Sequence, residues 1–224
     1  MSPTLHTVLG VLAGILTVLA PAAVLLRRRR HALHLALHEA THDDTTGLPN
    51  RRAALAHLRR LLHAGTPCGV VLLDLDDFKA INDTFGHETG NDLLRAVGQR
   101  LAALEAPVVL AGRLSGDEFV LIVDGDPDQV AHTAHAAWAA LVLRAFLLDT
   151  RTGTDTGVTA RVRASVGHTQ ARLGISPRDL LREADQAMYR AKTTGANVRA
   201  HTPTPATGDE HPARRPAPRF RDRR

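Results

Sequence analysis

Acidic residues in two short segments are the candidates for chemistry in this chain. They are Asp74, Asp76 and Asp77, directly after the apolar run VVLL at 70–73, and the pair Asp117 and Glu118 further along. Side chains alternate along a strand, so Asp74 and Asp76 leave it on the same side. Clustered carboxylates at a strand end are costly unless a cation neutralises them. Hard divalent ions prefer carboxylate oxygen, so the pattern favours a metal site over a solvated strand end.

The elements that must position these carboxylates are a buried strand and a hairpin. The unbroken apolar run at 70–73 predicts a strand covered on both faces. Segments 108–114 and 119–123 predict two strands joined by a tight turn, whose tip presents Asp117 and Glu118. Acidic residues are common in turns, so the tip alone identifies no site. After Asp77 we expect a short helix whose first N–H groups and Lys79 face an anion held by the metal.

The remaining periodicities predict a mixed sheet domain. Helices are expected at about 52–63, 91–104, 127–148 and 177–192, and a strand at 158–168, where apolar residues alternate. Strands interleaved with helices, together with one hairpin, indicate an α+β or mixed α/β domain spanning 43–201.

Composition sets limits on the class of protein. The 224 residues accommodate one domain of common size with flanking segments, and the 44% apolar content supplies a core. The net charge of +5 comes largely from the arginines at 27–30 and after Arg214, so we expect no nucleic-acid partner. A single cysteine, Cys68, excludes an internal disulfide and fits a reducing compartment.

The first 30 residues predict a membrane anchor. Residues 5–26 are almost entirely apolar and carry no formal charge, which is close to the length of a membrane-spanning helix. The four arginines at 27–30 follow this run, and the positive-inside rule then places the rest of the chain in the cytoplasm. A cleaved signal peptide is the alternative, because Ala20-Pro21-Ala22 has the character of a cleavage site.

A helical connector and a tail flank the predicted domain. Residues 31–42 predict a short helix with His31, His34, His38 and His42 along one face, solvated or in contact with a second copy. Metal binding and pH sensing by this face are alternatives. Residues 202–224 are rich in proline and arginine and predict a disordered tail, with contact to anionic lipid as an alternative to simple solvation.

Several ordered motifs together resemble the GGDEF-domain diguanylate cyclases. They are DDTTGLPNRR (43–52), DLDDFKAINDTFGHETGN (74–91), RLSGDEF (113–119), SVG (165–167) and ADQAMYRAK (184–192). The resemblance implies a mainly antiparallel sheet flanked by helices, like the palm of nucleotide polymerases. It also implies a homodimer that condenses two GTP molecules to cyclic di-GMP and pyrophosphate, with two Mg²⁺ or Mn²⁺ ions per active site.

The resemblance also implies a role for individual residues. Asp74, Asp117 and Glu118 match the metal carboxylates, and Leu75 would add its main-chain carbonyl. Glu118 would also help to deprotonate the 3′-hydroxyl. The remaining positions match substrate contacts: Lys79 and Lys192 with the main chain of Asp77 and Phe78 for phosphate, and Asn82 and Asn91 for guanine.

The chain departs from the family pattern at four places. Ser115 replaces the first glycine of the name motif, and Ala196 stands where a phosphate-binding arginine is common. Asn91 replaces an aspartate, and one amide acceptor cannot receive both guanine N–H groups as a carboxylate does, so we expect weaker GTP binding or looser base choice. Residues 106–109 read APVV, which lacks the inhibitory RxxD motif.

Two other functions remain open from the sequence. The departures at Asn91 and Ala196 would also fit a degenerate domain that binds nucleotide or a protein partner without turnover. The basic flanks would fit a membrane-surface or nucleic-acid-binding protein whose domain is only a scaffold, and its binding would depend strongly on salt.

Overall fold

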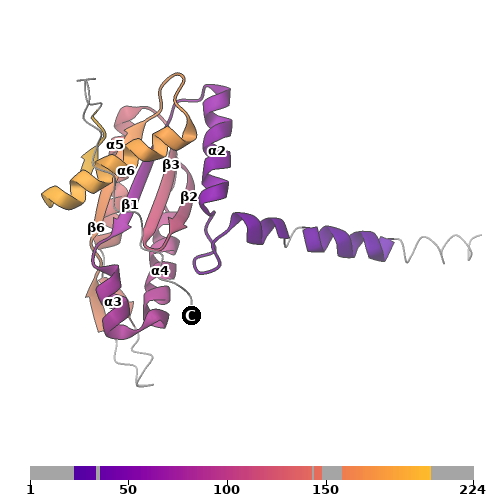
Figure 1. Ribbon diagram of the computed structural model, residues 1–224, viewed down its shortest axis with the longest axis horizontal. Coiled ribbons are helices and arrows are strands. Elements are labelled where there is room, and N and C mark those ends of the chain that lie inside the picture. The colour runs from indigo at the N-terminus through magenta and orange to yellow at the C-terminus, as the bar shows by residue number, and fades with distance from the viewer. Residues whose placement is uncertain (1–22, 34–35, 143, 148–157, 203–224) are drawn as a thin grey trace, which may run out of the picture.

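The computed structural model of the protein describes residues 23–33, 36–142, 144–147 and 158–202 (Figure 1). A five-stranded sheet forms its centre, in the order β2-β3-β1-β6-β7. Neighbouring strands are antiparallel except for the parallel pair β6 and β7. The strands are β1 (Cys68–Leu75), β2 (Val108–Ser115), β3 (Glu118–Asp124), β6 (Ala164–Gln170) and β7 (Val198–Ala200).

Helices cover both faces of this sheet, as Figure 1 shows. One face packs against α4 and α5, and the other against α2 and α6. The short α3 follows β1 at one end of the sheet. The helices are α2 (Arg51–Ala64), α3 (Phe78–Phe85), α4 (His87–Ala102), α5 (Pro127–Val142) and α6 (Pro177–Thr194). This arrangement is the mixed α/β fold with a mostly antiparallel sheet that the sequence predicts.

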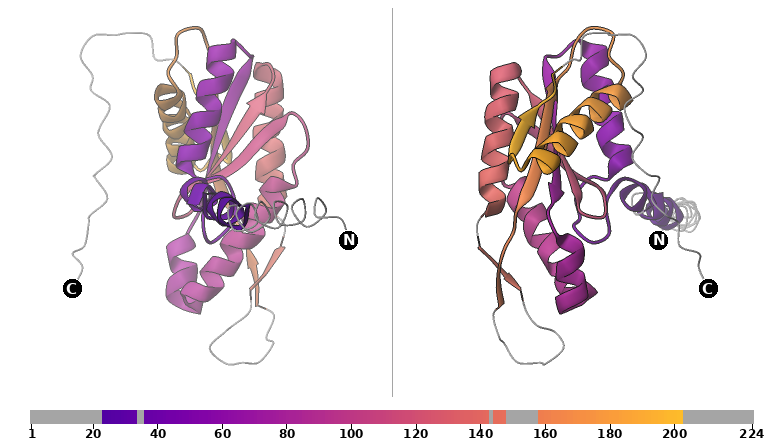
Figure 2. Two further views of the ribbon diagram at one scale, coloured as in Figure 1. Left: turned by 90° about the vertical axis from the view of Figure 1, so that its right-hand side faces the viewer. Right: turned by 60° about the vertical axis from the view of Figure 1, so that its left-hand side comes forward.

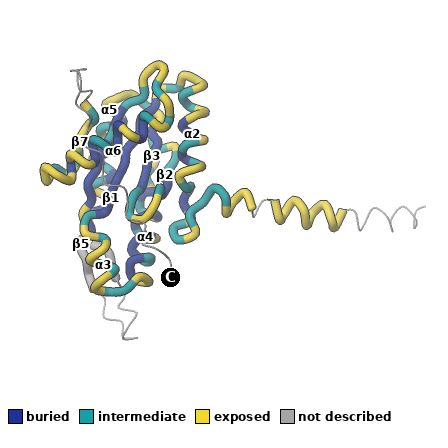
Figure 3. The backbone as a smooth tube through the Cα atoms, in the orientation of Figure 1, coloured by how far each residue is buried: buried dark blue, intermediate teal, exposed yellow. Residues whose placement is uncertain are grey.

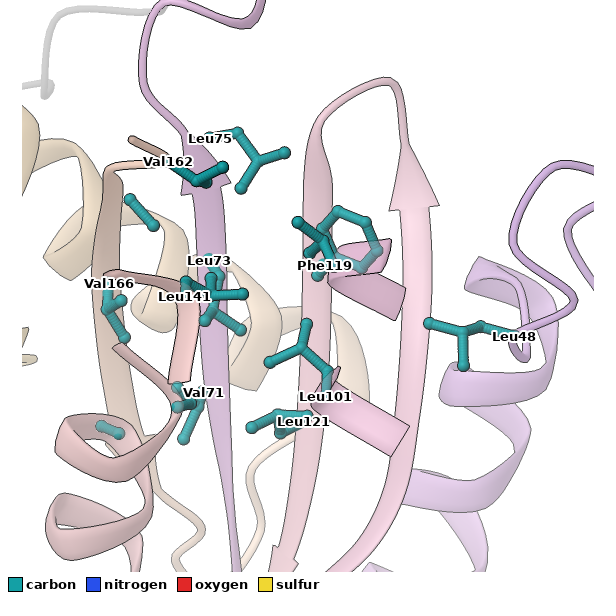
Figure 4. Packing of buried hydrophobic residues seen from close by; sticks show 14 of the residues in the cluster. Leu48, Val71, Leu73, Leu75, Leu101, Phe119, Leu121, Leu141, Val162 and Val166 are labelled. Carbon is teal, nitrogen blue, oxygen red and sulfur yellow. The ribbon is translucent and has the colours of Figure 1, made fainter. Parts of the chain in front are cut away.

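The central strand β1 is buried over its whole length, as predicted from its unbroken apolar run. Because side chains alternate along a strand, Val71 and Leu73 join the core beneath α4 and α5, while Val70 and Leu72 join the core beneath α2 and α6. Figure 4 shows Val71 and Leu73 beside Phe119 and Leu121 of β3. The dark central strands in Figure 3 show the same double coverage.

Two predicted elements after residue 126 had wrong bounds, and one strand was missed. The helix expected to reach residue 148 ends at Val142, and β4 (Arg144–Leu147) follows it. The strand expected at 158–168 is broken at 162–163 into β5 (Val158–Arg161) and β6. β4 and β5 pair only with each other and form a ribbon beyond the end of the main sheet (Figure 2). β7 was not predicted at all.

Residues 23–33, at the end of the predicted anchor and the start of the connector, are helical and exposed. Residues 36–41 of the connector are also helical, and they are exposed except for the half-buried Ala40 and Thr41. The rings of His38 and His42 stack with centroids 3.9 Å apart, as expected for one helical face. His34, most of the predicted membrane span and the tail from residue 203 lie outside the described residues. Among the helices within the described ranges, none combines the length and apolarity needed to cross a membrane.

A buried carboxylate on α6 connects this helix to the sheet through hydrogen bonds. Glu183 accepts two hydrogen bonds from Arg172, at 2.8 and 2.6 Å, and one from Thr169 at 3.2 Å. The Arg172 hydrogen bond holds the pKa of Glu183 below its ordinary value of 4.5, against the opposing effect of burial. A carboxylate whose pKa is lowered by folding stabilises the folded state fully at a pH above its unfolded pKa. This stabilisation is lost as the pH falls through the lower pKa of the folded state.

We therefore expect Glu183→Gln to lower the free energy of unfolding by about 1–3 kcal/mol at neutral pH. The difference from the parent should shrink in the acid range below 4.5, where the parent carboxylate also becomes neutral. Thermal or urea unfolding across this range measures both effects. A deficit that stayed constant down to the acid end would show that the charge of Glu183 contributes nothing.

Candidate active site

The predicted carboxylates meet at one end of the sheet because of strand register. Asp74, near the end of β1, pairs with Glu118 of β3 on one side and with Ser165 of β6 on the other. The hairpin tip is bound directly to β1, since the main-chain N–H of Leu75 donates to the carbonyl of Asp117 at 3.2 Å. Two segments more than forty residues apart thus bring Asp74, Asp117 and Glu118 together, as predicted.

Lys192 reaches the same place from the last turns of α6. Its Nζ atom donates a hydrogen bond to Asp74 Oδ1 at 2.5 Å, and Asp74 is buried. Burial by itself would lower the pKa of Lys192. The hydrogen bond to Asp74 and the charge of Asp74 outweigh burial and raise the pKa of Lys192 above its ordinary value. The ammonium therefore stays protonated and compensates part of the acidic charge at this end of the sheet.

The negative charge of Asp117 is less well compensated by nearby positive charge than that of Asp74. Burial and then the neighbouring charge of Asp74 raise the pKa of Asp117, and the charge of Lys192 offsets this only in part. A pair of close carboxylates with too little positive charge is the environment that a divalent cation stabilises. The donor set of Asp74, Asp117, Glu118 and the Leu75 carbonyl therefore fits Mg²⁺ in chemistry.

The described residues do not form a complete metal site by themselves. In the part of the chain that the structure describes, no three His, Cys, Asp or Glu side chains converge closely enough to hold a metal ion. Mg²⁺ is commonly bound through one or two carboxylates, with water and substrate phosphates completing its shell. An ion bound by these carboxylates would therefore keep coordination positions open for water or other oxygen ligands.

The hairpin tip has two supports that the sequence did not reveal. The hydroxyl of Ser115 donates to Glu118 Oε2 at 3.1 Å, a contact that glycine at this position could not make. Arg113, which is buried, donates to the carbonyl of Gly116 at 2.9 and 2.7 Å and to Asp43 at 2.8 Å. Asp43, in a loop seventy residues away, thus helps to fix the tip through Arg113 of β2. Their presence in two of the quoted motifs was the only signal for them.

The start of α3 places the predicted phosphate contacts. Asp77 adopts a left-handed backbone with φ 58° and its side chain does not cap the helix. Phe78 is half-buried and packs against the core, which anchors this first turn. Lys79 is exposed on the same turn. The first turn of α3 therefore lies close to the end of β1, and the exposed Lys79 side chain is not held against the carboxylates there.

The two predicted guanine-reading residues form a second group on α3 and α4. Asn82 and Asn91 are both half-buried, and Asn82 lies directly against Gly90, the neighbour of Asn91. A Cβ atom at residue 90 would lie 1.9 Å from Asn82 Oδ1 and 3.3 Å from Phe78 Cζ. Glycine at this position therefore allows the Asn82 side chain to lie across α4.

We expect Gly90→Ala to weaken guanine-nucleotide binding without harming the fold. The new methyl group would push the Asn82 amide aside, at a cost of roughly one hydrogen bond, or about 5- to 10-fold in affinity. Alanine in a helix is itself more favourable than glycine by about 0.5–1 kcal/mol, so the unfolding temperature should not fall. Calorimetric titration with GTP and a thermal melt measure the two effects. Unchanged GTP affinity would remove Asn82 from the binding site.

Two pockets adjoin the site. One of about 600 Å³ lies between α2 and α6 and reaches Glu118 and Leu114 at its edge. The other, of about 300 Å³, lies between the end of β1, the start of β6 and the end of α6. Arg163, Ser165 and Lys192 line this second pocket. Neither Arg163 nor Ser165 was predicted as a site residue. The signal for Ser165 was its place in the quoted SVG motif, and Arg163 lies on the polar side of the alternating pattern.

Comparison with known proteins identifies the family. The family described as "Diguanylate cyclase, GGDEF domain" matches residues 40–198, well over half of the chain. The protein therefore belongs to the GGDEF-domain family. The crystal structure of the coiled coil and GGDEF domain of DgcB from Caulobacter crescentus, in complex with c-di-GMP, is similar with a TM-score of 0.71. That similarity has 28% sequence identity and covers 83% of this chain and 98% of the DgcB chain.

Curated relatives share the domain but are longer. The chain is 32% identical over 176 residues to diguanylate cyclase VdcA of Vibrio cholerae, covering 79% of this chain and 51% of VdcA. It is 34% identical over 182 residues to the response regulator PleD of Caulobacter vibrioides, covering 75% of this chain and 37% of PleD. The chain thus spans about half, or less, of the length of these relatives.

Proposed function

We propose that this protein is a diguanylate cyclase that joins two GTP molecules into cyclic di-GMP. The observation that carries the proposal is that Asp74, Asp117, Glu118 and Lys192 lie at the same end of the sheet, with Asn82 and Asn91 on the adjoining helices. Membership of the family and the similarity to VdcA support the same activity. Two Mg²⁺ or Mn²⁺ ions would stabilise the negative charge that develops at the phosphate during transfer.

The residues of the chain then have separate tasks. Asn82 and Asn91 hold the guanine base, while Lys192, Lys79 and the first turn of α3 hold the phosphates. Glu118 accepts the proton of the 3′-hydroxyl, whose oxygen attacks the α-phosphorus of the second nucleotide as pyrophosphate leaves. Two such transfers close the ring and release two pyrophosphates.

The geometry of this reaction requires two copies of the site. One domain offers one hairpin tip and one guanine site, so the ring closes only where two domains face each other. We therefore propose a homodimer, with the connector at 31–42 setting its geometry. The predicted anchor would hold this dimer at the cytoplasmic side of a membrane. Because residues 106–109 lack the RxxD motif, we expect no product inhibition through that motif.

The test is to incubate the full chain with GTP and Mg²⁺ and to separate the products by chromatography and mass. Glu118→Gln is compared in parallel and should lower turnover by roughly 10²- to 10⁴-fold, the usual contribution of a general base. Asp124→Asn, an exposed carboxylate at the other end of β3, is the matched control. GTP binding without cyclic di-GMP from the parent protein would contradict the cyclase and favour the non-catalytic alternative.

A further inference from the structure

The pocket of about 300 Å³ at the end of β1 is lined by two cationic residues, together with Asp76 and Asp77. Lys192 lines it from α6, and Arg163 lines it from the segment just before β6. Ala196 lies in the same lining and has only a methyl group to offer. Two cations that face one small pocket can bind an anion together, whereas Ala196 contributes no hydrogen-bond donor.

The two cations differ in how firmly they are held. Lys192 is bound at 2.5 Å to the buried Asp74. Arg163 donates from Nη2 to Asp77 Oδ2 at 2.9 Å, and these side chains are 73% and 71% exposed. Ion pairs with such exposure contribute little to stability, because water competes for both partners. The guanidinium of Arg163 can therefore exchange Asp77 for a more highly charged anion at small cost.

The backbone of Arg163, in contrast, is fixed. Its main-chain carbonyl accepts a hydrogen bond from the N–H of Asp76 at 3.0 Å. Two residues further on, the hydroxyl of Ser165 donates to Asp76 Oδ1 at 2.9 Å. The side chain thus starts from a defined position at the end of β1, and only its long tip needs to move. A planar guanidinium with paired N–H donors matches phosphate oxygens in a bidentate manner.

We propose that Arg163 is a phosphate-binding residue that positions the terminal phosphates of the nucleoside triphosphate, opposite Lys192. This assignment rests on the function proposed above. It would give the site a second phosphate-binding cation, although Ala196 has no donor at the position where the family resemblance implies an arginine. The cation reaches the same pocket from the edge of β6 instead of from the end of α6.

Calorimetric titration of the full chain with 3′-deoxy-GTP and Mg²⁺ tests this assignment, because this nucleotide lacks the attacking hydroxyl and does not turn over. Arg163→Ala should weaken triphosphate binding roughly 10- to 100-fold, the usual effect of charge-assisted hydrogen bonds. Binding of 3′-deoxy-GMP, which lacks the terminal phosphates, should change by less than about 2-fold on the same reasoning. Ala196→Arg, added to Arg163→Ala, should restore much of the triphosphate affinity.

Arg182→Ala is the matched control, since Arg182 forms a similarly exposed 2.9 Å pair with Asp179. Equal losses for the triphosphate and monophosphate, or equal losses in the control, would overturn the role of Arg163. Unchanged triphosphate affinity in Arg163→Ala would overturn it as well. A parent protein that bound neither nucleotide would overturn the cyclase and this assignment together. Tight binding of 3′-deoxy-GTP by a parent protein that forms no cyclic di-GMP from GTP would overturn only the cyclase, and the difference between the two deoxynucleotides would still support Arg163.

Discussion

Replacing Asp117 with Asn should abolish most of the turnover and at the same time stabilise the protein. Turnover should fall by roughly 10³-fold or more, because metal charge stabilisation of the transition state is worth several kcal/mol. The fold should gain about 0.5–2 kcal/mol in metal-free buffer, the usual size of a stabilising change at a strained functional site.

The gain in stability follows from the direction of the Asp117 pKa. Burial and the charge of Asp74 raise this pKa above its ordinary value of 3.8, so the ionised carboxylate costs the folded state free energy at neutral pH. Asparagine removes that cost at neutral pH. The advantage should disappear in acid below 3.8, where the parent carboxylate is protonated in both the folded and unfolded states.

Thermal unfolding with and without Mg²⁺ and a GTP analogue separates the two effects. The parent protein should gain stability from the ligands, and Asp117→Asn should gain less. Asp124→Asn, at the exposed end of β3, should change neither stability nor turnover. A variant that was less stable than the parent in metal-free buffer would show that Asp117 is a structural residue and not a strained ligand.

Gly167→Ala should cause a large loss of stability through a single added methyl group. A Cβ atom at residue 167 would lie 2.1 Å from the main-chain N of Met188, 2.3 Å from the carbonyl of Ala184 and 2.7 Å from the Met188 Cα atom. All three atoms belong to the backbone of α6, so no side-chain rotation relieves the overlap. The whole helix must move away from β6.

We expect this change to cost roughly 3 kcal/mol or more, at the upper end for overpacked cores. The displacement also moves Lys192 away from Asp74, so nucleotide affinity should fall together with the unfolding temperature. Gly98→Ala is the control, because the nearest atom to its methyl group would be the Thr46 Cβ atom, 3.2 Å away in a side chain. Its cost should stay within about 1 kcal/mol. Similar melts for the two variants would contradict the tight packing of α6 on β6.

The sequence alone determined the elements that local pattern specifies. The unbroken apolar run of β1 could be assigned to a doubly covered strand, because only burial on both faces tolerates four successive apolar residues without a polar one. The hairpin around Gly116 was equally readable, since both its strands and its turn lie within seventeen residues. The ordered motifs also indicated which acidic residues belong to the candidate site, because each motif is contiguous in the chain.

Only the tertiary structure decided where chain segments with ambiguous local pattern would lie. Residues 144–147 continue a helical pattern, yet they form β4 because a partner strand, β5, lies within reach. The salt bridge from Arg113 to Asp43 and the hydrogen bond from Ser165 to Asp76 join residues 70 and 89 positions apart. No local periodicity encodes contacts at such separations. The sequence pattern predicts Arg163 as an ordinary outward residue of a strand, and only the tertiary structure shows that it lines the pocket of about 300 Å³ with Lys192.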